Sequence, residues 1–299
     1  MRIIVPTETG LEIEAALAKP KRGIHTIELE RFIMQMPGLM SWLLCVDRAE
    51  GAIMFSRLFG KKKETIEDVS ALKAAALDAA IEAARATNPV VHLKVGAEEL
   101  VDRLLAAMKT KRGVHAESIL GALGSLAGFC CVDSALKQAA ALNRSGRECG
   151  IVVAETSNGN RYYFGDPINY FLAESKLSLW ALVGGVINDL GSQDYPNFAE
   201  IAEHVAGTIG EPEFGYPRVP EQHQPGDLPI NYVREIWPPI LPLVEHRAPV
   251  LQERITLFGF AVQNVILMGK DVIPAATAGK LVMECAVPMA KLDPAKLWA

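Results

Sequence analysis

The uncharged middle of the chain constrains its fold more than any other feature. No residue from Ser118 to Val132 carries a charge, and the stretches Ile255–Gly269 and Leu177–Ile187 are similarly free of charge. A membrane-spanning helix needs about 20 consecutive apolar residues, so all three stretches are short for that role. We therefore expect three helices buried in the core of a water-soluble protein, and no integral membrane segment.

The N-terminus and the cysteines indicate a cytoplasmic protein. The apolar run Ile3–Val5 is far shorter than the core of a signal peptide. The 5 cysteines are odd in number, and no two have the C-x-x-C spacing of a zinc or redox motif. Reduced thiols that pack as small apolar side chains are typical of the cytoplasm. We expect cytoplasmic localisation.

The charge balance argues against nucleic acid as a partner. The formal net charge is −5, and 50% of the residues are hydrophobic. Phosphate binding needs a basic surface, and the sequence has no motif that combines aromatic and basic residues. We expect no nucleic-acid partner.

The first part of the chain predicts helices around a hairpin and a strand. Helical spacing begins near Thr26, and the apolar runs Trp42–Val46 and Ala52–Phe55 predict a hairpin. A long apolar stripe then predicts a helix over 65–87. Regular alternation predicts a strand over Val90–Val95, followed by a helix over 97–109.

A second hairpin gives the clearest local signal. The runs Ile151–Thr156 and Arg161–Phe164 flank Asn158-Gly159, a pair that favours a two-residue type I′ turn. Counting outward from that turn pairs Glu155 with Tyr162. Both faces would then be largely apolar, so we expect packing on both sides of the sheet.

Helices are expected on both sides of this hairpin. The pattern predicts helices over 118–129 and 133–143 before it. Asp166-Pro167 should begin the next helix, with Asp166 as its cap, and this helix should run to about Leu190. A shorter helix is expected over 197–208.

The segment Glu211–Pro249 should be an extended arm. It holds half of the 18 prolines of the chain, and proline removes backbone donors and blocks long regular elements. Aromatic and aliphatic residues lie between these prolines, so the arm should pack over the rest of the protein rather than act as a free linker. Helices are expected over 250–268 and 275–289.

These elements predict an α+β fold that is mainly helical, with short antiparallel hairpins. The expected domains are an N-terminal α+β domain at 1–112, a second α+β domain at 113–210, and the arm with C-terminal helices at 211–299. Helix, hairpin and long helix occur in the same order around 26–87 and 133–190. The two halves could therefore be similar units.

No motif identifies a reaction, a metal or a cofactor. The stretch Pro274–Leu281 resembles a phosphate-binding loop, but it has proline in place of the first glycine and leucine in place of the Ser or Thr. The glycines around Gly124 lack the dinucleotide-binding spacing, and the 6 histidines show no metal-ligand spacing. No G-x-S-x-G motif occurs. Cys149 is the best candidate for a nucleophilic thiol, although a structural role is the simpler interpretation.

Two groups of polar residues are the candidates for lining a ligand pocket. The first follows the second hairpin and comprises Tyr162, Asn169 and Tyr170, with Asp166 already explained as a helix cap. The second lies in the arm and comprises His223, Tyr232 and Arg234.

Three functions remain open from the sequence, and the third is peripheral membrane attachment through an apolar helix. The leading hypothesis is a non-catalytic homo-oligomer that binds a partner or a small-molecule ligand, because the chain is apolar and has no catalytic motif. The alternative is an enzyme whose site joins Tyr162 or Asn169 to His223 or Arg234 where the arm crosses the second hairpin.

Overall fold

The computed structural model describes residues 66–111 and 113–298, and the chain divides into two compact units, Met1–Ala84 and Arg85–Ala299. In the first unit, the helix α3 (Ile66–Arg85) confirms the helix predicted over 65–87. The predicted helix from Thr26 and the predicted first hairpin lie outside the described residues. Residues 85–299 form one unit in the structure, and the expected division of the chain at 112 and 210 stays a prediction.

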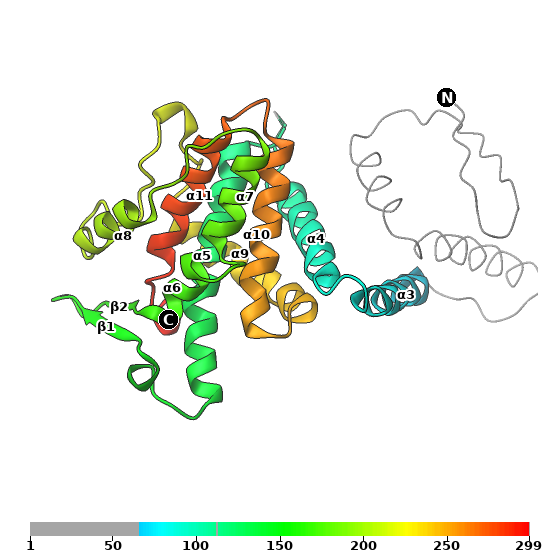
Figure 1. The fold of residues 1–299 in the computed structure, drawn as a ribbon, viewed down its shortest axis with the longest axis horizontal. Helices are drawn as coiled ribbons and strands as arrows, with labels where there is room; N and C mark the ends of the chain where they lie inside the picture. Colours follow the sequence, from blue (N-terminus) through cyan, green and yellow to red (C-terminus); the bar gives the residue numbers. More distant parts are fainter. Residues whose placement is uncertain (1–65, 112, 299) are drawn as a thin grey trace, which may run out of the picture. The chain divides into compact units, whose positions relative to one another are not determined.

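Helix α5 (Ala116–Ala141) forms the centre of the second unit. It packs against α9 (Pro229–Arg247), α10 (Leu251–Met268) and α11 (Ala275–Met289) in a helical bundle, and α4 (Val91–Ala107) packs in turn against α9 and α10 (Figure 1). The side chains from Ile119 to Cys131 are almost all fully buried, which confirms the expected core helix. The two helices predicted over 118–129 and 133–143 are one continuous helix.

Two glycines set the distance between α5 and α11. A Cβ atom on Gly124 would lie 2.5 Å from the carbonyl oxygen of Val282, and one on Gly128 would lie 2.6 Å from the carbonyl carbon of Ala286. Real Cβ atoms do not approach backbone this closely, so the two helix backbones contact each other directly at these positions.

The strand predicted over Val90–Val95 is wrong, because this segment forms the first turns of α4. Val91, His92 and Leu93 are buried one after another, whereas a strand would bury alternate residues. Helix α4 packs between α9 and α10, and His92 Nε2 lies 3.2 Å from Oε2 of Glu253 on α10. A run of six residues is too short to distinguish the helical periodicity from the strand periodicity, and here packing against α9 and α10 selects the helix.

The second hairpin is present, but its register differs from the predicted one. Strands β1 (Val152–Glu155) and β2 (Arg161–Phe164) pair antiparallel with Glu155 opposite Arg161. The turn has three central residues, and Gly159 alone has a positive φ, of 78°. A type I′ turn needs two such residues, so the chain forms the longer loop, and every pair shifts by one residue.

Strand β1 is exposed on both faces, which corrects the expectation of packing on both faces of the sheet. Val152 is 61% exposed and Val153 is 48% exposed, while Tyr162 is buried. The outer edge of β2 is bonded to the chain after α11, where the carbonyl of Lys291 accepts the N–H of Tyr163 at 2.8 Å. The hairpin thus lies next to the C-terminal end of the chain (Figure 1).

The helix predicted over 166–190 is three separate elements. Helix α6 (Asp166–Asn169) runs into a π-helix, η2 (Tyr170–Glu174), and α7 (Leu179–Asp189) begins after a turn. Gly165 is the N-cap of α6, so the expected cap role of Asp166 is wrong. Ser178 caps α7 by accepting the N–H of Ala181. Helix α8 (Phe198–Gly207) confirms the helix predicted over 197–208.

The predicted extended arm is correct only up to residue 228. Residues 211–228 are irregular apart from a short 3-10 helix, η3 (Glu221–His223), whereas residues 229–247 form α9, which contains Pro238, Pro239 and Pro242. Pro238 cannot donate to the carbonyl of Arg234, and the indole Nε1 of Trp298 donates to that oxygen instead, at 3.1 Å. A donor from outside the helix therefore replaces one of the missing bonds.

The arm is fixed to α11 by a buried ion pair. Glu284 is 2% exposed, and its carboxylate lies 2.9 Å from Nη2 of Arg218. Nη1 of Arg218 also lies 3.1 Å from the exposed carboxylate of Glu200 on α8. The described part of the chain is thus mainly helical with one two-stranded antiparallel sheet, in agreement with a helix-dominated α+β fold, and α10 and α11 confirm the predicted C-terminal helices.

Candidate functional site

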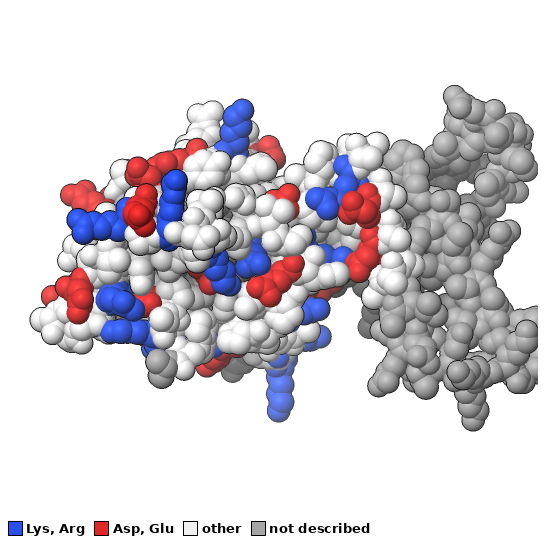
Figure 2. Space-filling view, turned by 90° about the horizontal axis from the view of Figure 1, so that it is seen from below, with Lys and Arg blue, Asp and Glu red and all other residues white. Residues whose placement is uncertain are grey.

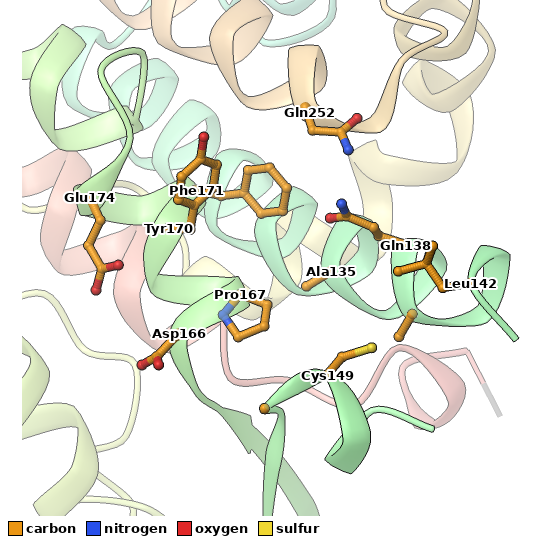
Figure 3. Close-up of a pocket in the computed structure, with 12 residues that line it drawn as sticks. Ala135, Gln138, Leu142, Cys149, Asp166, Pro167, Tyr170, Phe171, Glu174 and Gln252 are labelled. Atoms are coloured by element: carbon orange, nitrogen blue, oxygen red, sulfur yellow. The ribbon is translucent and has the colours of Figure 1, made fainter. Parts of the chain in front are cut away.

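A cavity of about 620 Å³ lies between the C-terminal end of α5 and the segment that follows the second hairpin. We call it the hairpin-exit pocket. Its apolar wall comes from α5 and from the segment 166–171 (Figure 3). The residues that line this wall are Ala135, Ala139, Leu142, Pro167, Tyr170 and Phe171.

The polar groups of the hairpin-exit pocket are divided between two sides. Figure 3 shows Asp166 and Glu174 on one side and the amides of Gln138 and Gln252 on the other. Both carboxylates are exposed to solvent. No described residue that lines the pocket is a Lys or Arg, so the pocket carries a negative charge at its edge. Cys149, half-buried, also lines it.

An irregular helix shapes one wall of this pocket. Tyr170, Phe171 and Glu174 all belong to the π-helix η2, in which each turn holds an extra residue. π-Helical turns are rare and occur frequently at functional sites. Phe171 is buried, while Tyr170 is 51% exposed and its ring lies edge-on to that of Phe171 at 5.7 Å. The π-helix therefore supplies two aromatic rings to the pocket, one buried in the wall and one exposed at the rim.

A second cavity, of about 360 Å³, lies at the opposite end of α5. We call it the α5 N-terminal pocket. It lies between the C-terminal end of α4 and the first turn of α5, and His115, Ser118 and Tyr232 line it together with Lys109. Ser118 and Ala135, which line the two pockets, are 17 positions apart in one helix, which corresponds to about 25 Å at 1.5 Å per residue.

Hydrogen bonds join the polar residues of the α5 N-terminal pocket into a network. His115 Nδ1 lies 2.8 Å from Ser118 Oγ, and Ser118 Oγ accepts the N–H of Gly226 at 2.9 Å. The hydroxyl of Tyr232 bonds to Ser118 and accepts the N–H of Asp227 at 3.0 Å. Burial raises the pKa of Tyr232, so its phenol stays protonated.

Glu117 connects two histidines beneath this network. Its Oε2 lies 3.2 Å from Nε2 of His115, and its Oε1 lies 2.9 Å from Nδ1 of His223. Burial alone would raise the pKa of Glu117, but the hydrogen bond from His223 and the two nearby imidazoles lower it overall. Glu117 is therefore a carboxylate at neutral pH. Over the described ranges, no group of three His, Cys, Asp or Glu has the geometry of a metal site.

The structure does not bring the six predicted site residues together in one pocket. Tyr170 lines the hairpin-exit pocket, and Asn169 precedes it at the end of α6, half-buried. Tyr162 packs edge-on against Phe214 at 5.1 Å.

The three candidates from the segment 211–249 lie away from the hairpin-exit pocket. His223 and Tyr232 both belong to the network at the N-terminus of α5. Arg234 has an exposed side chain on α9, and its carbonyl bonds to Trp298. His115, Glu117 and Ser118 were not recognisable as site residues from the sequence, because polar residues before an apolar stretch are also typical of an ordinary helix N-terminus.

A buried amine lies close to the hairpin. Lys291 is 4% exposed, and its Nζ lies 5.0 Å from the centre of the Phe164 ring. Within residues 66–111 and 113–298 it has no carboxylate partner, and burial lowers its pKa to about 8.

We expect Lys291→Met to raise the free energy of unfolding at pH 7 by about 1–3 kcal/mol, because the charged amine is costly to bury. The folded-state pKa of about 8 lies below the unfolded value near 10.5. The unfolded chain therefore binds more protons between these values, and wild-type stability should rise with pH across that window. Urea unfolding at pH 7 and pH 10 should show this rise in the wild type and in the exposed control Lys176→Met. An equal rise in Lys291→Met would show that Lys291 is not its source.

Comparison of the chain with known protein families, with curated proteins and with solved structures gives no match.

Proposed function

We propose that the hairpin-exit pocket is a binding site, without catalysis, for a small molecule with an apolar body and a positively charged group. The observation that carries the proposal is the charge of this pocket. Its wall is apolar, Asp166 and Glu174 lie at one side, and its described lining includes no basic residue.

The chemistry of the wall indicates the kind of ligand. Ala135, Ala139 and Phe171 offer apolar surface, which favours an alkyl or aryl body. The face of Tyr170 is accessible at the rim, and aromatic rings attract cations. An anionic head group would meet the two carboxylates with no cation to offset them.

Binding of octylamine tests this proposal, with octanol and octanoate as matched probes of the same chain length. We expect isothermal titration calorimetry to show that octylamine binds about 5–10-fold more tightly than octanol, because two exposed carboxylates each contribute up to about 1 kcal/mol. The double variant Asp166→Asn, Glu174→Gln should remove this preference. Asp189→Asn, an exposed carboxylate outside the pocket, should keep it. Equal affinity of the wild type for octylamine and octanol would contradict the proposal.

The proposal includes a cytoplasmic homo-oligomer without an integral membrane segment or a nucleic-acid partner. Two helical stretches are long and apolar enough to cross a membrane, Ala116–Ala141 and Asp166–Asp189, and 94% and 44% of their apolar windows are buried inside the protein. On the face that Figure 2 shows, Lys and Arg are interspersed with Asp and Glu rather than gathered into a basic patch, and this pattern gives no support to a polyanionic partner there. The exposed Val152 and Val153 on β1 support self-association, for which light scattering is the test. We also propose that 26–87 and 133–190 are similar units, because the sequence predicts helix, hairpin and long helix in the same order in both.

A further inference from the structure

The polar network of the α5 N-terminal pocket allows one consistent arrangement of its protons when His115 is neutral. Glu117 accepts the Nε2–H of His115, so Nδ1 of the same ring is the acceptor for the hydroxyl proton of Ser118. Ser118 Oγ in turn accepts the N–H of Gly226. A hydroxyl, an imidazole and a carboxylate are thus connected in series.

This series has the connections of an activated nucleophile. A serine is activated when a base lies within hydrogen-bond reach of its hydroxyl and a third group orients that base. Here the base is His115, whose side chain is 54% exposed and accessible from the pocket, while Glu117 beneath it is 8% exposed. In the usual triad Nε2 of the histidine faces the serine and Nδ1 faces the carboxylate. Here the two nitrogens are exchanged, because Nδ1 of His115 faces Ser118 and Nε2 faces Glu117.

We infer that Ser118 is a nucleophile that accepts the acyl group of a small ester in the α5 N-terminal pocket, with His115 as its base. Ser118 Oγ forms a bond to the acyl carbon, and its proton moves to Nδ1 of His115. The bond from the acyl carbon to the leaving alkoxide breaks, and the imidazolium returns the proton to that alkoxide, which departs as an alcohol. Water then cleaves the acyl-Ser118 ester, with His115 again accepting and returning the proton, and releases a carboxylic acid.

The surroundings of Ser118 favour negative charge on the reacting oxygens. The first N–H groups of an α-helix have no acceptor within the helix, and the N-cap residue of α5, His115, does not cap them with its side chain. The helix dipole adds positive potential at the same place. Glu117 is a positioning residue, because it orients His115 and does not reach the substrate, and His223 holds its other oxygen.

Covalent labelling of the full chain with an alkyl fluorophosphonate tests the inference. The Ser118 oxygen should bond to phosphorus as fluoride leaves, which peptide mapping by mass spectrometry would place on Ser118. Hydrolysis of p-nitrophenyl acetate should fall at least about 100-fold in Ser118→Ala and in His115→Gln. Ser145→Ala is the matched control, because Ser145 Oγ donates to Glu148 at 2.7 Å with no histidine nearby, and it should leave labelling and hydrolysis unchanged.

Glu117→Gln separates a positioning role from a purely structural one. We expect its rate to fall about 10-fold or more, and the low-pH limb of the pH–rate profile to move to lower pH, because the imidazolium loses its carboxylate partner. A fall in rate with an unchanged profile would show that Glu117 does not act through His115 and would overturn the assignment. A label on any residue other than Ser118, or no label on the folded wild type, would overturn the assignment of Ser118 as the nucleophile. This result does not depend on whether Ser118→Ala folds, because it is measured on the wild type.

Discussion

Gly128→Ala is expected to destabilise the folded chain by about 3 kcal/mol or more, although it adds a single methyl group. That methyl would overlap the backbone of Ala286, which cannot move without separating α5 from α11. Forcing atoms into a packed core typically costs 1–3 kcal/mol, and backbone yields less readily than a side chain. Urea unfolding followed by circular dichroism measures the change.

Gly184→Ala is the control for this prediction. Gly184 lies inside α7, and a Cβ there would meet only Cδ1 of Tyr195 at 3.7 Å, an ordinary contact. Alanine is favoured over glycine in a helix by about 1 kcal/mol, so this variant should be more stable than the wild type. The same substitution thus has opposite signs at the two sites. If Gly128→Ala were as stable as Gly184→Ala, α5 and α11 would not be in backbone contact.

Arg218→Ala is expected to destabilise the protein by about 3–5 kcal/mol, because it leaves the buried carboxylate of Glu284 without a cation. A second substitution should recover stability if the unpaired charge of Glu284 causes the loss. Adding Glu284→Gln to Arg218→Ala removes the uncompensated charge and should recover a large part of the loss, which a double-mutant cycle in urea would measure.

Glu200→Ala provides the comparison for this ion pair. It removes the exposed partner of the same arginine, and such pairs contribute at most about 1 kcal/mol. A loss in Arg218→Ala no larger than that in Glu200→Ala would show that the arm is not held to α11 by the buried pair.

Local sequence signals predicted the positions of most elements, and packing decided the rest. The Asn158-Gly159 pair correctly located the second hairpin, but only Gly159 adopts a positive φ, so the register moved by one residue. The apolar segment from Ser118 predicted the core helix correctly because such a segment has to be buried. Val90–Val95 was assigned to a strand because six residues cannot distinguish the two periodicities once neighbouring helices bury successive side chains.

The prolines of α9 show why the arm was predicted only in part. Pro238 removes a helical donor, and Trp298, distant in sequence, replaces it at the carbonyl of Arg234. No local rule could foresee that bond.

In the candidate sites too, local sequence signals identified some residues, and the folded structure alone shows the others. Tyr170 and Asp166 were recognisable because they follow the hairpin closely, and both line the hairpin-exit pocket. Gln138 and Gln252, which line another side of this pocket, come from α5 and α10 and reach it only in the folded chain. Likewise His223 was a candidate, but its connection to Glu117 depends on how the arm crosses the first turn of α5.

The most direct test of the proposed binding site is a crystal structure of the protein grown with octylamine. The account predicts density for the alkyl chain along Phe171 and Ala139, with the amine nitrogen within about 4 Å of a carboxylate oxygen of Asp166 or Glu174. Density for octylamine in another cavity, or an amine that points away from both carboxylates, would contradict it.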